Sequence, residues 1–200
     1  MPRREALPAD HNRLPQGDVP CPGMSVLRHW RAVPSPSVMW RESYRADPAA
    51  RPLADRHYNR QKIGAPQFVP PGACLVFLTA CQRALWVTSN PKAEYVKHAW
   101  AGAWVNSLFR SEGAGLASSL IRQAVSATRS VWNPPPLGIV SFVDPKHVKP
   151  VIRRGKAIYG YCYLMAGWKH VGFTKGGLWA WQQLPEEMPE AEQLPILEAA

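Results

Sequence analysis

The sequence lacks any long apolar run, since no hydrophobic stretch approaches the roughly 20 residues that a membrane-spanning helix needs. Arg3 and Arg4 are not followed by an apolar segment, so we expect no signal peptide. Global disorder is also excluded, because 46% of the residues are hydrophobic. We therefore expect a folded protein that stays in the cytoplasm and has no membrane partner.

Cysteine is scarce as well. The four cysteines, Cys21, Cys74, Cys81 and Cys162, form no CxxC pair, and three of them stand among apolar or aromatic neighbours. This usage predicts buried, reduced thiols and argues against a structural zinc site built on cysteine.

Acidic residues are absent between Asp144 and Glu186, whereas seven basic residues occur there: Lys146, Lys149, Arg153, Arg154, Lys156, Lys169 and Lys175. Five of the fourteen acidic residues lie in the last sixteen positions, which hold no lysine or arginine, so residues 1–184 carry a net charge of +15 against +10 for the whole chain. A field of one sign attracts a polyanion, which favours double-stranded DNA as partner. A solvated basic face is the alternative.

Composition divides the chain into three parts. Residues 1–23 hold five prolines and two glycines without periodicity, which predicts a flexible arm. Residues 24–184 predict one domain, in which prolines interrupt residues 24–56 and favour irregular structure there. The acidic tail, 185–200, is predicted to be disordered or weakly helical.

Hydrophobic periodicity from Gly72 onward predicts an α/β layer arrangement. Short apolar runs predict strands, a helical spacing of apolar residues predicts one long helix, and a short helix or loop precedes the last strand. The predicted strands are 73–80, 83–88, 99–109, 137–143 and 177–184, the long helix is 116–131, and the short helix or loop is 161–168.

A glycine turn, Arg110-Ser-Glu-Gly113-Ala-Gly115, follows a predicted strand and precedes the long helix. Glycines allow a ligand to approach the backbone, and free N–H groups at a helix start favour phosphate. A plain strand-to-helix turn explains the same residues. The turn resembles the [RQ]-x-x-G-x-[GA] loop with which GNAT acyltransferases bind the pyrophosphate of acyl-coenzyme A, which implies cofactor contacts from Arg110, Gly113 and Gly115.

A more specific resemblance covers roughly residues 53–180. Ser141-Phe-Val-Asp144, the G-x-x-Y-x-x-A-G-W pattern of 160–168 and the glycine–threonine turn at 172–174 are similar to the C-terminal half of the phage Mu Mom-like DNA-modification family, within the GNAT-like superfamily. Asp55-Arg-His57-Tyr58-Asn59 resembles the family's His-Tyr-Ser segment, with Asn59 in the serine position.

The resemblance implies a GNAT-like central mixed sheet flanked by helices, in a single domain. It implies a phage transferase that adds a glycyl- or acyl-derived group to an exocyclic base amine, the N6 amine of adenine, so that phage DNA evades restriction in the host cytoplasm. The donor stays open between acetyl-coenzyme A and an aminoacyl-tRNA-type glycine donor. An iron ion is also implied, with His57 and Asp144 as its ligands.

Each candidate catalytic residue has a structural alternative. Asp144 ends a predicted strand, where α/β sheets bind ligands, but it also suits a turn before Pro145. His57 suits a general base or a structural contact. Tyr58 and Tyr163 suit base stacking or the core. Ser118 and its neighbour Ser119 suit a hydrogen bond to the donor or a polar helix face.

Three hypotheses remain. The first is a Mom-type DNA-modifying transferase, with Lys146, Lys149, Arg153 and Arg154 on the phosphates next to the target base. The second is an acetyl-coenzyme-A-dependent N-acetyltransferase acting on another amine, including an amino-modified base of phage DNA. The third is a non-catalytic, basic DNA-binding protein.

Overall fold

The structure, a computed structural model, describes residues 40–194, so the predicted arm at 1–23 lies outside the described residues. The strands are β1 (Trp40–Ser43), β2 (Ala73–Thr79), β3 (Ala84–Asn90), β4 (Trp104–Ser111), β5 (Ile139–Val143), β6 (Val151–Arg153), β7 (Lys156–Ile158), β8 (Lys169–Phe173) and β9 (Trp179–Gln183). The helices are α1 (Arg51–Asp55), α2 (Ala117–Val131) and α3 (Tyr161–Met165), with short 3₁₀ turns η1 (Ala93–Tyr95) and η2 (Pro185–Glu187).

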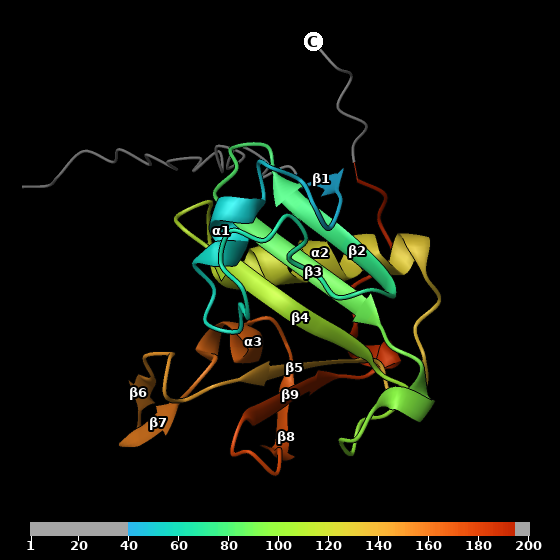
Figure 1. The fold of residues 1–200 in the computed structure, drawn as a ribbon. Coiled ribbons are helices and arrows are strands. Elements are labelled where there is room, and N and C mark those ends of the chain that lie inside the picture. Colours follow the sequence, from blue (N-terminus) through green and yellow to red (C-terminus); the bar gives the residue numbers. More distant parts are fainter. Residues whose placement is uncertain (1–39, 195–200) are drawn as a thin grey trace, which may run out of the picture. The chain divides into compact units, whose positions relative to one another are not determined.

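A seven-stranded sheet in the order β1-β2-β3-β4-β5-β9-β8 forms the centre of the molecule (Figure 1). Its neighbours are antiparallel except β4 and β5, which run parallel and are therefore joined by a crossover, α2. The short strands β6 and β7 form a separate two-stranded hairpin between β5 and α3. The described residues are thus one mixed α/β unit with a mostly antiparallel sheet.

Helix α2 covers one face of the sheet because its apolar residues recur at helical intervals. Leu120, Ile121 and Val125 are fully buried against Trp86 and Trp104 of the sheet. The opposite side of the helix is polar. Within residues 40–194, no helix is long and apolar enough to cross a membrane.

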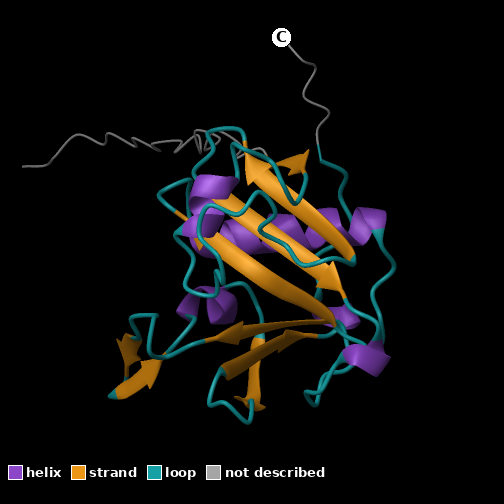
Figure 2. Cartoon of the chain, in the orientation of Figure 1, coloured by secondary structure: helices purple, strands orange, loops and turns teal. Residues whose placement is uncertain are grey.

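Helix α1 and the segment after it cover the other face, as Figure 2 shows. Leu53 of α1 and Phe68 of the following loop pack against Val76, Leu85 and Leu108 of strands β2 to β4. Arg60 shapes the loop, since its guanidinium pairs with Asp55 at 2.7 Å and donates to two backbone carbonyls, those of Ala65 and Gln67. Both faces of strands β2 and β3 are therefore buried, as their continuous apolar runs require.

Most predicted elements are confirmed, with differences where the pattern was weak. The strands expected at 73–80, 83–88, 137–143 and 177–184 and the helix at 116–131 occur within a few residues of those bounds. The strand expected from Ala99 begins only at Trp104. Strand β1 and helix α1 lie in the segment expected to be irregular, while β6, β7 and β8 were not expected, because exposed strands carry no continuous apolar run.

The described part of the acidic tail, for which the sequence predicted disorder or weak helicity, includes the short turn η2 and contacts the domain. Met188 is buried, and Arg129 of α2 donates to the carbonyl oxygens of Met188 and Pro189 at 3.1 and 2.6 Å. Lys169 pairs with Glu187. Met188, Leu194 and the hydrogen bonds from Arg129 thus attach the described part of the tail to the domain.

Cysteine placement agrees with the expectation of free thiols but only partly with that of burial. Cys74 and Cys162 are half-buried, whereas Cys81 is exposed in the turn between β2 and β3. Burial raises the pKa of the Cys162 thiol to about 11, so this thiol is protonated at neutral pH. It is therefore unsuited to act as a nucleophile.

Candidate functional site at the separation of β4 and β5

The two parallel strands β4 and β5 pair over only three residues and then separate. The pairing ends at Asn106 opposite Ser141, while β4 continues to Ser111 along β3 (Figure 1). A bulge accompanies the separation, because Asn106 faces Thr88 and Leu108 faces Val87, which leaves Ser107 without a partner on β3. A cavity of about 270 Å³ lies here, lined by residues of both strands.

The segment His57–Asn59, which follows α1, bridges the gap between the strands. Asn59 donates from its amide nitrogen to the Ser107 carbonyl of β4 at 2.6 Å. The Tyr58 hydroxyl donates to the Phe142 carbonyl of β5 at 3.2 Å and accepts the Asp144 N–H at 3.4 Å. All three side chains line the cavity, so the segment closes the gap that the strands leave open.

Asp144 forms a pair with His147 directly after β5. One Asp144 oxygen, Oδ2, lies 3.1 Å from His147 Nδ1, and the other accepts the Lys146 N–H at 2.8 Å. The pKa of Asp144 is lowered, chiefly by the Lys146 N–H and also by His147, so the carboxylate is ionised at neutral pH. This geometry orients an imidazole for proton transfer, as in acid–base pairs of enzymes.

Tyr58 connects this pair to His57. Its ring stacks on His57 at 4.4 Å between centroids and on His147 at 5.3 Å, with interplanar angles of 28° and 9°. Burial lowers the pKa of His57, with a further contribution from Arg110, so the ring is neutral at pH 7. His57 Nδ1 lies 2.5 Å from the Asn59 side-chain oxygen, and therefore His57 holds the bridge in place.

A buried polar cluster forms the floor of the cavity. The hydroxyls of Tyr163 and Ser141 both donate to the Asn106 side-chain oxygen, at 2.6 and 3.1 Å. The Asn106 amide nitrogen donates to the carbonyls of Val87 and Leu108, each at 3.0 Å. Burial raises the pKa of Tyr163 well above its ordinary value, so its hydroxyl keeps its proton. Asn106 thus fixes both strands and α3 around the cavity.

Replacing Asn106 by Ala is expected to lower the free energy of unfolding by about 3 kcal/mol, since two buried hydroxyls and two carbonyls lose a partner at roughly 1–3 kcal/mol each before relaxation. Urea unfolding of the purified variant measures this loss. Ser107→Ala, which removes one half-exposed hydroxyl contact with Ser89, is the control and is expected to cost under about 1 kcal/mol. Equal small losses in both variants would contradict the structural role of Asn106.

The glycine turn is built around Glu112. Its carboxylate accepts from Arg56 at 2.8 Å and from Arg110 Nε at 2.7 Å, and Arg110 also donates to the Arg56 carbonyl. Gly113 and Gly115 have positive φ values of 80° and 139°, but an added Cβ at Gly113 would lie 2.7 Å from the Arg83 guanidinium. In this conformation the turn offers neither Arg110 nor Gly113 to a pyrophosphate, so it does not fit coenzyme A as expected.

The Glu112 carboxylate also predicts an acid sensitivity. Hydrogen bonds from Arg56 and Arg110 lower its pKa from 4.5 to about 2. A folded-state pKa below the unfolded value stabilises the fold above pH 4.5, and this contribution is lost as the pH falls toward 2. We expect the melting temperature of Glu112→Gln to fall less than that of the wild type between pH 5 and pH 2. Parallel melting curves over this range would contradict the role of Glu112.

The implied iron site does not fit the side chains. Within residues 40–194 no group of three or more His, Cys, Asp or Glu side chains is arranged to hold a metal ion. His57 Nδ1 faces Asn59, and both Asp144 oxygens already accept contacts from Lys146 and His147. In this conformation His57 and Asp144 both contact Tyr58 and are not arranged as joint ligands.

The remaining predicted residues are divided between the site and its surroundings. Ser118 is buried in the first turn of α2 but does not line the cavity, and Ser119 lies near Arg122.

Sequence reasoning missed three residues of the site: Asn106, Ser141 and His147. A polar residue inside an apolar strand, and a histidine three positions after a strand-end aspartate, were the available signals.

The basic residues after Asp144 lie on an exposed hairpin, 151–158, and on the segment that leads to it. Strands β6 and β7 are joined by Arg154 and Gly155, whose φ values of 48° and 74° match a tight hairpin turn. Arg153 lies 5.4 Å from the Tyr161 ring centre. Among the described residues, no basic side chain of the group Lys146, Lys149, Arg153, Arg154 and Lys156 forms an ion pair. These charges are therefore available to an anionic partner.

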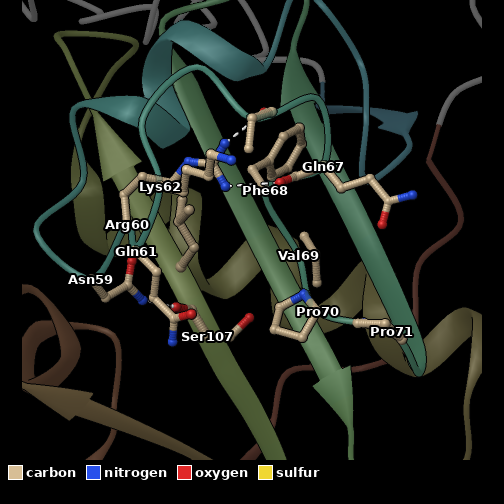
Figure 3. A pocket seen from close by; sticks show the side chains of 12 residues that line it. Asn59, Arg60, Gln61, Lys62, Gln67, Phe68, Val69, Pro70, Pro71 and Ser107 are labelled. Atoms are coloured by element: carbon tan, nitrogen blue, oxygen red, sulfur yellow. Dashed lines mark hydrogen bonds between the residues drawn. The ribbon is translucent and has the colours of Figure 1, made fainter.

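A larger cavity, of about 550 Å³, adjoins the site under the loop that follows Asn59 (Figure 3). It shares Asn59, Ser107 and Leu108 with the smaller cavity. Lys62 and Gln67 stand at its edge in Figure 3. Asn59, Ser107 and Leu108 thus form the wall that the two cavities share.

No family model, curated protein or solved structure matches the chain.

Proposed function

We propose that this chain is a GNAT-like transferase that adds an acyl- or glycyl-derived group to an exocyclic amine of a DNA base, adenine N6 being the amine implied by the resemblance to Mom-type proteins. The observation that carries the proposal is the Asp144–His147 pair, which lies where β4 and β5 separate and immediately precedes the basic hairpin. A proton acceptor and an anion-binding surface are thus adjacent in the chain.

The strand arrangement supports the GNAT-like part of the proposal. A single parallel pair, a bulge beside it and a helical crossover are features expected of that fold. The motifs that carry the Mom resemblance also gather around the separation: 141–144 ends β5, Tyr163 of α3 reaches Asn106, and 57–59 bridges the strands. Segments far apart in the sequence therefore contribute to one cavity.

The chemistry we propose is an acyl transfer with His147 as general base. The amine nitrogen forms a bond to the acyl carbon of the donor while the bond to the leaving group breaks. The imidazole nitrogen of His147 that Asp144 does not face takes the amine proton and returns it to the leaving group. Asp144 holds the ring, and Tyr58 packs against it. The donor's carrier would have room in the larger cavity beyond Asn59.

An acetyl-coenzyme-A-dependent N-acetyltransferase is the second candidate. The first N–H groups of α2 favour it, because Leu116 provides no side-chain cap and a phosphate is bound well at such a helix start. The Arg110–Glu112 ion pair opposes it. The third candidate, a basic protein that binds DNA without chemistry, is supported by the unpaired charges of the hairpin but leaves the Asp144–His147 pair unexplained.

Restriction of plasmid DNA tests the proposal. Plasmid from cells that make the protein is digested with endonucleases whose sites contain adenine, and with endonucleases whose sites contain only G·C pairs. We expect the first group alone to be inhibited relative to plasmid from cells without the protein. Complete cleavage by both groups would contradict DNA modification, and equal inhibition of both would contradict adenine as the target.

A further inference from the structure

A third cavity lies beside Phe142 of β5. It measures about 380 Å³ and is formed by residues 97–100, which precede β4, and residues 173–176, which begin the turn between β8 and β9. We call it the aromatic cavity, because His98, Trp100 and Phe173 contribute its walls. It is within the size range of small-ligand pockets.

The aromatic cavity is connected to the site through Phe142. The Phe142 ring contacts His98 at 4.9 Å and Trp100 at 5.7 Å between centroids, and Phe142 also lines the 270 Å³ cavity beside Tyr58. Leu178 lines the same smaller cavity and is hydrogen-bonded to Thr174 of the aromatic cavity. The Phe142 side chain would therefore separate a planar ligand in the aromatic cavity from the 270 Å³ cavity that Tyr58 lines.

Exposed aromatic surface and lysines occur together at this cavity. Phe173 is 59% exposed, so its ring is accessible to a ligand. Burial lowers the pKa of His98, so its ring is neutral at pH 7. Lys97 and Lys175 stand on the two lining segments, and neither forms an ion pair within residues 40–194. Stacking surfaces flanked by cations fit a base with its phosphates.

We infer that the aromatic cavity receives an unstacked base of DNA next to the target base. Trp100 and Phe173 stack on the base, and Lys97 and Lys175 contact the adjoining phosphates. This inference rests on the proposed function and names the subsite of its nucleic-acid substrate. The hairpin β6–β7 and strand β8 lie at the same end of the molecule in Figure 1.

Extrusion of the base predicts a preference for mismatched DNA, because a mismatched base is already partly unstacked. Fluorescence anisotropy is used to titrate the full-length protein into a paired duplex and into the same duplex with one mismatched adenine. We expect wild type to bind the mismatched duplex about tenfold tighter or more. Trp100→Ala and Phe173→Ala are expected to reduce the preference below about threefold while binding paired DNA nearly as wild type does.

Tyr95→Ala is the matched control, because Tyr95 is 76% exposed on the same segment but does not line the cavity. It is expected to keep the preference. Retention of the preference in both Trp100→Ala and Phe173→Ala would overturn the inference, and so would wild-type binding of both duplexes with equal affinity. Tight binding of free adenosine without a mismatch preference would overturn it too. Failure of wild type to bind any DNA would instead contradict the proposed function.

Discussion

Replacing His147 by Gln is expected to slow DNA modification by about 10²–10⁴-fold, the range that general acid–base catalysis contributes. Gln keeps a polar side chain of similar length but cannot take a proton from the amine. Among the described residues, the half-exposed ring pairs with Asp144 and stacks on Tyr58, so the fold should tolerate the change. The yield of modified nucleoside over time, in cells making equal amounts of protein, measures the effect.

Asp144→Asn belongs to the same test, because a neutral amide stabilises the protonated His147 ring less than the carboxylate does. We expect a clear loss of rate, smaller than that of His147→Gln, with unchanged DNA affinity. His170→Gln is the control, since His170 is an exposed histidine on β8 that packs against Trp179 and takes no part in the pair. Full activity of His147→Gln would contradict the proposed base.

Neutralising the hairpin together with Lys149, which precedes it, is expected to produce the second large effect. A variant with four basic residues replaced by Gln (Lys149, Arg153, Arg154 and Lys156) should lose most of its DNA affinity at moderate salt. Each phosphate contact contributes about 0.9 to the slope of log affinity against log salt, so the slope should fall by about three to four. The measurement is a set of binding titrations over a range of salt concentrations.

Lys62→Gln/Lys92→Gln removes two exposed lysines outside the hairpin and controls for net charge. Its slope is expected to change by less than about one. Equal changes per removed charge in the two variants would mean that DNA responds only to overall charge. The hairpin would then have no particular part in binding.

The fold was predictable where burial leaves a strong pattern. The runs 73–79 and 84–90 are buried on both faces, and Leu120, Ile121 and Val125 repeat at helical spacing, so these elements could be identified. Strand β8 could not be predicted, because four of its five residues are exposed and backbone pairing with β9 holds it in place. Register and the early separation of β4 from β5 depend on contacts between distant residues.

The site was predictable in part for the same reason. Asp144 could be placed at a strand end, and Tyr58 and Tyr163 could be named from their motifs, but their partners could not. Asn106 holds Tyr163 across 57 positions of sequence. The sequence shows that Glu112 is unusual in a phosphate-binding turn. Its ion pairs with Arg110 and Arg56 could not be predicted, because the fold brings Arg56 to the turn.

The nucleoside mass spectrum of DNA from producing cells tests the central claim most directly. Wild type and His147→Gln are compared at equal protein levels, and the purified variant is shown to bind duplex DNA as wild type does. We predict a new adenine nucleoside with wild type, whose added mass identifies the donor group, and at most about one hundredth of it with the variant. Unmodified nucleosides with wild type, or equal adduct with both proteins, would contradict the account.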